Sequence, residues 1–227
     1  DITTLIGTGK KQKSMAVVPV ASAAPYAAAD ADMTFRLLPL LQAELDNNAM
    51  LELLHLEMEL IPVLAQMEMN GVLLDSNFLS EFSVELEQQI HSLNDAVIQA
   101  VGYEFNLKSP QQLSVALFEH MGIHPPHGTR PTTSGHFSTA VGVLQDLAEE
   151  HIVVREILQY RELAKLKSTY VDALLLAVNA ETGRVHTSFN QTGTVTGRLS
   201  SSRPNLQNIP IRTEVGRQVR RAFVAPS

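Results

Sequence analysis

The 227-residue sequence predicts a mainly α-helical fold with a small antiparallel β portion near its C-terminus. Three observations predict this fold. Apolar residues recur every three or four positions through much of the chain before residue 178, which is typical of amphipathic helices. Ser, Asp, Asn, Gly and Pro stand where these periodic segments begin and end. Polar and apolar residues alternate, as in a half-buried strand, only over Arg184–Phe189.

Two helices are expected in the first third of the chain. Residues 1–14 are rich in Gly, Lys and Thr and are expected to form a loop. One helix is expected over Ala27–Leu45, starting near Tyr26, and a second over Met50–Met69. Asn70 and Gly71 then provide a left-handed cap, and the next three residues form an extended connector. The expected buried stripe of the second helix comprises Leu51, Leu54, Met58, Ile61 and Ala65.

A long amphipathic helix is expected next, with Asp75 or Ser76 as its N-cap and its end near Val101. Ser109 and Pro110 are typical of a helix start, so a further helix is expected from there to about Met121. The apolar stripe of the long helix comprises Leu79, Phe82, Leu86, Ile90, Leu93 and Val97.

The remaining helices follow a flexible tip over His124–Gly135, which is rich in Pro, Gly and Thr. A short helix is expected over Thr139–Glu150 and a long one over Val153–Val178. The basic residues expected on the exposed side of the long helix are Arg155, Arg161, Lys165 and Lys167.

Strands are expected only after the turn at Thr182 and Gly183. Arg184–Phe189 is expected to pair antiparallel with Thr194–Ser200. Arg217–Phe223 is expected to form a short helix or an extended segment.

Charge is distributed unevenly along the chain. The net charge is −7, but residues 152–227 hold eleven Lys and Arg against five Asp and Glu, a net +6. Residues 1–151 hold six basic and nineteen acidic groups, a net −13. This asymmetry predicts that the C-terminal third alone faces a polyanion.

Several protein classes are disfavoured by composition. The chain has no cysteine, which excludes disulfides and Cys-ligated zinc and is consistent with the cytoplasm. Its apolar runs are too short to cross a membrane. Asp1 follows neither a Met nor a basic segment, so we expect no signal peptide and an internal piece of a longer protein.

The densest group of hydrogen-bond donors lies over Thr196–Arg212. It combines guanidinium groups, carboxamides and hydroxyls with turn-forming Gly and Pro, and it contains no acid. Such a surface suits phosphates and the acceptors at base-pair edges. The run resembles, nearly letter for letter, the segment before the first catalytic carboxylate of family A (bacterial DNA polymerase I-like) DNA polymerases.

Three other segments carry the same resemblance. Tyr160–Tyr170 resembles the long thumb helix of these polymerases, and Asn106–Leu113 resembles a thumb signature. His186–Gln191 resembles the beginning of their palm. The resemblance thus implies a long-helix thumb subdomain followed by the first strands of a polymerase palm, within an α+β parent protein.

The resemblance also implies domain boundaries. Residues 1–46 would be the C-terminal end of a 3′–5′ exonuclease-like domain. Residues 47–183 would be the thumb, with a connecting helix over 50–70. Residues 184–227 would be the N-terminal segment of the palm.

DNA-contacting roles are implied for the residues that match these motifs. Arg198 is expected to donate to a purine N3 or pyrimidine O2 at the primer terminus, a contact that tests pair geometry without reading base identity. Arg212 has the planar fork that suits phosphate and is expected near the triphosphate of the incoming nucleotide. The other expected DNA-binding residues are Asn205, Gln207 and Asn208 in the same run and Arg161, Lys165, Lys167, Ser168 and Thr169 on the thumb helix.

A second resemblance lies near the N-terminus. Tyr26–Asp32 resembles the third motif of DEDDy proofreading exonucleases, in which a Tyr orients the attacking water and an Asp four residues later helps to bind metal ions. Tyr26 and Asp30 stand at i and i+4, on one face of the expected helix. The partner carboxylates of that motif set are missing from the sequence, so we expect no complete metal site and a helix that is merely retained.

The implied parent protein is a DNA-directed DNA polymerase of replication and repair, in the cytoplasm of a bacterium and associated with the nucleoid. Its partners would be a DNA primer–template duplex and deoxynucleoside triphosphates, with no membrane. It would extend a primer by attack of the 3′ hydroxyl on an α-phosphate, using two Mg²⁺ ions. The catalytic carboxylates are expected beyond Ser227, so the fragment alone is expected to be inactive. A second chain or the missing remainder of the polymerase would complete the palm.

Two other interpretations stay open. The chain could be a stand-alone, sequence-nonspecific DNA-binding module, or the remnant of a DEDDy-type 3′–5′ exonuclease. Salt-dependent binding to unrelated duplexes would be common to the polymerase and the module. The exonuclease would require further carboxylates upstream of Asp1.

Overall fold

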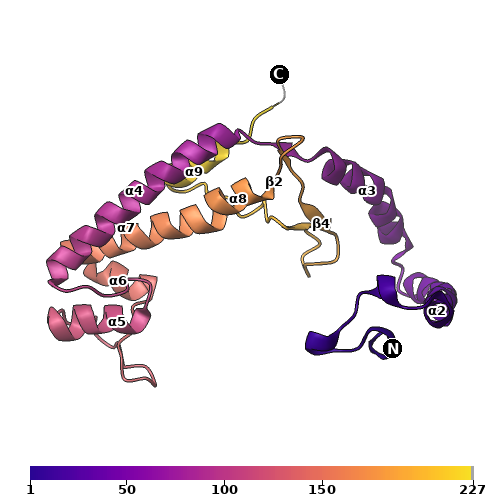
Figure 1. Ribbon diagram of the computed structural model, residues 1–227, viewed down its shortest axis with the longest axis horizontal. Helices are drawn as coiled ribbons and strands as arrows, with labels where there is room; N and C mark the ends of the chain where they lie inside the picture. Colours follow the sequence, from indigo (N-terminus) through magenta and orange to yellow (C-terminus); the bar gives the residue numbers. More distant parts are fainter. Residues whose placement is uncertain (226–227) are drawn as a thin grey trace. The chain divides into compact units, whose positions relative to one another are not determined.

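The computed structural model describes residues 1–225, which fall into two compact units, Asp1–Leu64 and the part from Ala65 onward. Helices dominate both units (Figure 1). The predicted fold, mainly α-helical with small antiparallel sheets, is confirmed. The units divide inside helix α3 (Leu51–Asn70), and the domain boundaries implied by the resemblance stay predictions.

The first unit is helical almost from its start. It contains α1 (Thr3–Ile6), the 3₁₀ turns η1 (Gly9–Lys11) and η2 (Met15–Val17), and α2 (Val20–Asn47). The expectation of a loop over residues 1–14 is therefore wrong in part. The carboxylate of Asp1 accepts a hydrogen bond of 3.0 Å from the Thr3 amide, which stabilises the first turn. Helix α2 begins before Tyr26 because the Ala-rich residues ahead of it favour helix.

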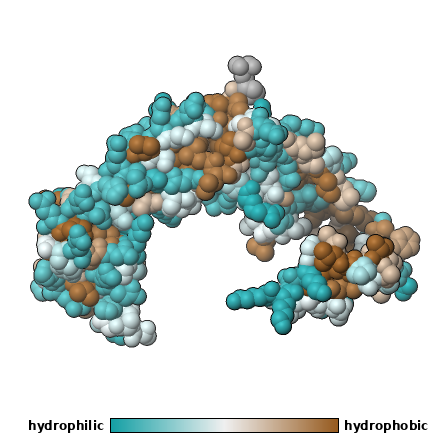
Figure 2. Space-filling model, viewed as in Figure 1, coloured by the Kyte–Doolittle hydropathy of each residue, from teal (hydrophilic) through white to brown (hydrophobic). Residues whose placement is uncertain are grey.

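Helix α2 leaves its apolar side chains uncovered. None of its 28 described residues is buried. Phe35, Leu38 and Leu40 are 76%, 60% and 67% exposed, and Figure 2 shows apolar residues gathered over this helix. None of the described helices has the length and apolar content needed to cross a bilayer.

The expected buried stripe of α3 is only partly correct. Leu51 and Leu54 are half-buried, but Met58, Ile61 and Ala65 are exposed, and the buried residue is Leu64. Apolar residues occur on more than one face of this helix, so periodicity alone does not indicate which face packs. Gly71 ends the helix with φ +60°, as predicted.

A pair of long helices forms the core of the second unit. Helix α4 (Ser76–Val101) runs beside α7 (Ile152–Leu166) (Figure 1). The Asp75 carboxylate caps α4 by accepting from the Phe78 amide at 3.0 Å, as predicted. Fully or nearly fully buried side chains include Leu79, Phe82, Leu86 and Val97 from α4 and Val154, Ile157 and Leu163 from α7.

Shorter helices pack at one end of this pair. Helix α5 (Pro110–Ser114) begins at the predicted Ser109 cap and continues as a π-helical segment, η3 (Val115–His120). The tip over residues 124–135 has no helix or strand, as expected. Helix α6 (Val141–Leu147) is shorter than the expected Thr139–Glu150. Thr139 lies buried just before it, and its carbonyl accepts a hydrogen bond from Arg161.

The predicted helix over Val153–Val178 is interrupted. After α7 the chain forms a π-helical turn, η4 (Lys167–Val171), and then α8 (Asp172–Ala177). A π-helical turn widens a helix and shifts the faces of the residues that follow, an effect that sequence periodicity does not reveal.

Two small sheets follow. Strand β3 (Arg184–Val185) pairs antiparallel with β1 (Val72–Leu73) and β2 (Val178–Asn179). Residues 72–73 are therefore a paired strand and not only a connector. Strand β4 (Ser188–Asn190) pairs with β5 (Ser200–Ser202), with Phe189 opposite Ser201.

The expected single strand over Arg184–Phe189 is therefore wrong, because β3 and β4 belong to different sheets, and its expected partner Thr194–Ser200 is placed too early. Most of that stretch is a turn, because the Thr194 hydroxyl donates to the Arg198 carbonyl at 2.7 Å and accepts from the Arg198 amide at 3.1 Å. Gly197, at φ +72°, supplies the left-handed residue that this turn needs.

The last described element is α9 (Glu214–Arg221), capped by the Thr213 hydroxyl. It begins before the expected Arg217. Gly216 lies against the preceding segment so closely that a Cβ there would lie 2.6 Å from Cβ of Pro210. The end of α9 is held by the Asp75 amide, which donates to the Ala222 carbonyl at 2.8 Å.

Candidate nucleic-acid interface

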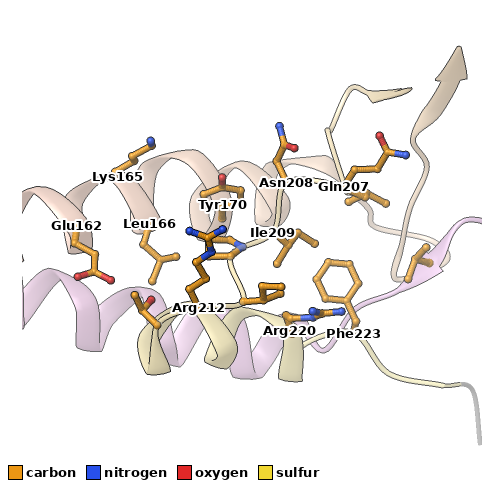
Figure 3. A pocket seen from close by; sticks show the side chains of 15 residues that line it. Glu162, Lys165, Leu166, Tyr170, Gln207, Asn208, Ile209, Arg212, Arg220 and Phe223 are labelled. Atoms are coloured by element: carbon orange, nitrogen blue, oxygen red, sulfur yellow. The ribbon is translucent and has the colours of Figure 1, made fainter. Parts of the chain in front are cut away.

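A groove of about 1160 Å³ lies within the second unit (Figure 3). Helix α7 and the turn η4 line one side, and the segment Leu206–Thr213 with α9 lines the other. Three cations and one carboxylate line it, so the groove is electropositive in a chain whose net charge is −7. These charged residues are Glu162, Lys165, Arg212 and Arg220, and the uncharged lining includes Gln207, Asn208, Tyr170 and Ile209.

Buried hydroxyls hold the segment that forms the second wall. Thr187, 6% exposed, donates to the Pro204 carbonyl at 2.8 Å. Ser201, 4% exposed, accepts from the Leu206 amide at 2.9 Å. The chain after β5 is thus tied to the β4–β5 sheet at one end and packed on α9, through Pro210 and Gly216, at the other.

The predicted carboxamides divide into two kinds. Asn205 accepts from the Gln207 amide at 3.0 Å, and the Gln207 side chain donates to the Leu199 carbonyl at 3.1 Å. These two side chains therefore stabilise the loop itself. Asn208 is exposed at the groove, and its side chain makes no hydrogen bond to another residue within 1–225.

The two predicted arginines lie in different places. Arg212 lines the groove, and Figure 3 shows its side chain extending towards the helix that carries Tyr170. Arg198 lies in the turn between β4 and β5 and is not among the described residues that line the groove. The backbone of Arg198 is fixed by Thr194, while its exposed side chain has no partner among the described residues.

Lys165 is exposed on α7, as expected, and Ser168 and Thr169 are exposed on η4. Lys165 lines the groove, and with Ser168 it also lines a neighbouring cavity of about 910 Å³ beside the segment 132–141. The Ser168 hydroxyl donates to the Ala164 carbonyl at 2.8 Å, so its oxygen still has acceptor capacity.

Arg161 was expected on the exposed side of the helix, and this expectation is wrong. Its half-buried guanidinium donates to the Thr139 carbonyl and, at 3.2 Å, to the Thr139 hydroxyl. Burial lowers the pKa of Arg161 below its ordinary value. The side chain of Arg161 therefore links the segment before α6 to helix α7.

The same expectation is wrong for Lys167, whose side chain is only 17% exposed. Its ammonium lies 2.9 Å from the Asp172 carboxylate and 3.0 Å from that of Glu87 on α4. The hydrogen bond to Asp172 is the main cause that raises the pKa of Lys167. The charge of Lys167 is thus already neutralised by two carboxylates.

Arg220 is the groove cation that sequence reasoning missed. It comes from an arginine-rich stretch whose structure was expected to be either a short helix or an extended segment, so no face could be assigned to its members. The helical register of α9 is what separates Arg220 from Arg217 and Arg221.

The family model for DNA polymerase family A matches residues 76–227, a range that holds every residue lining the groove except Val72. The chain belongs to DNA polymerase family A.

Relatives of this family A chain match nearly all of it. DNA polymerase I of Chloroflexus aurantiacus is 50% identical over 227 residues, which is 99% of this chain and 24% of the relative. DNA polymerase I of Pseudomonas aeruginosa is 46% identical over 225 residues, 98% of this chain and 24% of the relative. The chain thus spans about a quarter of the length of these relatives.

A solved structure resembles the family A chain as well. The POL domain of Pol1 from M. smegmatis, in complex with DNA primer-template and dNTP, has a TM-score of 0.67 and 42% sequence identity. The match covers 75% of this chain and 29% of that one. The family resemblance inferred from the motifs is confirmed.

The possible exonuclease motif lies in the first unit. Tyr26 and Asp30 share one face of α2, and the hydrogen bond with Asp30 raises the pKa of Tyr26. Across the residues that the structure describes, no three His, Asp or Glu side chains come together in a group that could hold a metal ion. Asp30 therefore has no partners with which to complete a metal site here.

Proposed function

We propose that the complete protein is a DNA-directed DNA polymerase and that this chain grips its primer–template duplex. In this proposal residues 1–46 end an exonuclease-like domain, residues 47–183 form the thumb and residues 184–227 begin the palm. Family A membership and relatives that are DNA polymerase I support the activity. The bound primer-template and dNTP of the M. smegmatis neighbour support the partners.

One observation carries the proposal: the electropositive groove between α7 and the segment Leu206–Thr213. A polymerase must hold any sequence, so its contacts go to phosphates and to minor-groove acceptors that all base pairs share. The groove offers both kinds of donor, with Lys165 and Arg212 as cations and the amide of Asn208, which makes no hydrogen bond to another described residue.

The predicted residues have roles in this proposal, except Arg161 and Lys167, whose side chains are bound within the fold. Arg198 contacts the minor-groove edge of the primer-terminal pair, because its unpaired guanidinium projects from a turn of fixed backbone. Arg212 binds the phosphates of the incoming nucleotide. Lys165, Ser168 and Thr169 contact the duplex backbone, while Asn205 and Gln207 act chiefly by holding the loop that presents Asn208.

Family membership implies a divalent-metal-dependent enzyme, and Mg²⁺ is the ion in this proposal. The residues described here do not fit a metal site, because they contain no suitable group of acidic and His side chains. We therefore assign no chemical step to a metal on this chain. The bacterial cytoplasm, close to the nucleoid, is the proposed location, since the relatives are bacterial enzymes.

Replacing Arg198 by Ala in the complete protein tests the proposal. We expect primer extension from a matched terminus to slow by on the order of tenfold or more, because a hydrogen bond from a charged group is lost. Arg217→Ala is the matched control, since Arg217 is exposed but already paired with Glu214. Single-turnover extension of a labelled primer measures both variants.

Primer-extension assays also distinguish the polymerase from the two other interpretations, a DNA-binding module and a 3′–5′ exonuclease. Unchanged extension by Arg198→Ala would count against its assigned role. A complete protein that binds unrelated duplexes but never extends a primer would be a DNA-binding module. One that only shortens the primer would be a 3′–5′ exonuclease.

A further inference from the structure

Helix α9 presents two neighbouring arginines to two different surroundings. Arg220 lines the electropositive groove together with Lys165 and Arg212. Arg221 lines a separate cavity of about 370 Å³, which carboxylates of α4 line as well. The residues of that second cavity include Glu81, Glu85, Glu214 and Phe78.

The side chain of Arg221 is already engaged. Its guanidinium lies over the ring of Phe78, 5.1 Å from the centroid, and donates to the Gln218 side chain at 2.7 Å. Arg217 likewise pairs with Glu214. Arg220 is exposed, and its side chain makes no hydrogen bond or ion pair with another residue of the described chain.

The backbone of Arg220 is nevertheless held firmly. Its neighbours Val219 and Ala222 are both completely buried. The Arg220 carbonyl accepts from the Phe223 amide at 3.1 Å, and Phe223 forms a β-bridge with Leu74. A fixed backbone with an unpaired charge at its side chain is the arrangement that a preorganised anion site requires.

The groove around Arg220 lacks the carboxylates that would neutralise it. Among residues 1–225, Glu162 is the one acidic residue that lines the groove, against three cations. Figure 3 shows Arg220 beside Phe223 on the same side of the groove as Arg212, with Lys165 on the helix opposite. Cations on both walls suit a ligand whose negative charges are spaced along its length.

We propose that Arg220 is a phosphate-binding residue of the groove and acts together with Arg212 and Lys165. This inference rests on the proposed function and adds a contact that the sequence motifs did not indicate. The phosphate belongs either to the backbone of the bound strand or to a nucleoside triphosphate, and a guanidinium fork suits both.

The test compares Arg220→Gln, Arg220→Lys and Arg221→Gln in the complete protein. Binding of a labelled primer–template duplex is measured by fluorescence anisotropy over a range of salt concentrations, and binding of a dNTP is measured on the preformed duplex complex. Thermal unfolding of each variant confirms that it folds. Arg221→Gln is the matched control, because it removes the same charge from the adjacent position of the same helix.

If the phosphate belongs to the DNA backbone, Arg220→Gln weakens duplex binding about tenfold. It also makes the negative slope of log K against log salt less steep by about 0.9, the value for one lost phosphate contact. Arg220→Lys keeps the wild-type slope, and so does Arg221→Gln. If the phosphate belongs to the nucleotide, duplex binding stays unchanged and dNTP affinity falls about tenfold instead.

Two results would overturn this inference and leave the proposed function intact. One is a wild-type protein that binds duplex in a salt-dependent way while Arg220→Gln matches it for both ligands. The other is an equal loss of slope in Arg220→Gln and Arg221→Gln, which would indicate a general charge effect. A wild-type protein that does not bind duplex at all would overturn the proposed function itself, and this inference with it.

Discussion

Lys165 and Lys167 stand two positions apart in the sequence, yet their ammonium groups have opposite surroundings. Lys165 is exposed, lines the groove and has no side-chain partner among the described residues. Lys167 lies between the carboxylates of Glu87 and Asp172, and Asp172 also accepts from the Ser83 hydroxyl at 2.8 Å. A lysine bound in this way joins α4 to η4 and has little charge left to offer to a phosphate.

These surroundings predict different effects of the same substitution. Lys165→Met should make the negative slope of log K against log salt for duplex binding less steep by about 0.9, because one phosphate contact disappears. Lys167→Met should leave the slope unchanged and lower the free energy of unfolding by about 1 kcal/mol, the scale of a partly exposed ion pair. Anisotropy titrations and urea denaturation measure the two quantities. Equal slope losses in both variants would contradict the assignment.

At the scale of elements, the groove depends on how α9 meets the segment before it. A Cβ on Gly216 would lie 2.6 Å from Cβ of Pro210 and 3.0 Å from the Thr213 hydroxyl that caps the helix. The contact therefore leaves no room for a side chain. It sets the distance between Arg212, at the end of the segment, and Arg220, at the end of α9.

Gly216→Ala should accordingly destabilise the protein by about 1–3 kcal/mol, since overpacking must push α9 away from Pro210. Gly142→Ala is the control, because Gly142 lies in α6 and a Cβ there meets nothing within 4 Å. This control should be neutral or stabilise the protein by up to about 1 kcal/mol, owing to the higher helix propensity of Ala. Denaturant unfolding measures the free energy of unfolding of both variants. If Gly216→Ala were as stable as wild type, the contact between α9 and Pro210 would be able to relax, contrary to this prediction.

At the scale of the whole molecule, the electropositive groove and the exposed apolar helix belong to different units. The groove and its cations belong to the second unit, whereas the first unit carries the exposed apolar helix α2 and the Tyr26–Asp30 pair. Asp30 has no described acidic or His neighbours that could complete a metal site with it. Duplex binding is therefore a property that we expect from the second unit.

Asp30→Asn should consequently leave both salt-dependent duplex binding and primer extension unchanged. Lys165→Met, measured in the same assays, provides the positive control because it removes a charge from the groove. A weaker duplex affinity in Asp30→Asn would mean that the first unit contributes to the grip on DNA, contrary to this division of roles.

Several features followed from the sequence because their signals are local. The Asp75 cap, the Ser109 cap and the Gly71 stop each depend on a few consecutive residues, and all three lie where they were expected. The stripe of α4 was predicted correctly because one face of that helix is clearly apolar. The family was recognisable from the run Thr196–Arg212, whose composition is unusual over its whole length.

Tertiary structure decided what depends on residues far apart in the chain. Lys167 is neutralised by Glu87, which lies 80 positions away in the sequence, and Arg161 is held by Thr139. The packed face of α3 likewise depends on packing between elements. The late start of β5 follows instead from the turn held by Thr194, and the helical register of α9 separates Arg220 from Arg221. The sequence by itself therefore determined most of the helices, several of their caps and the family. Which cations stay unpaired to meet a ligand was set by the fold, because a charge is free only if no distant carboxylate reaches it.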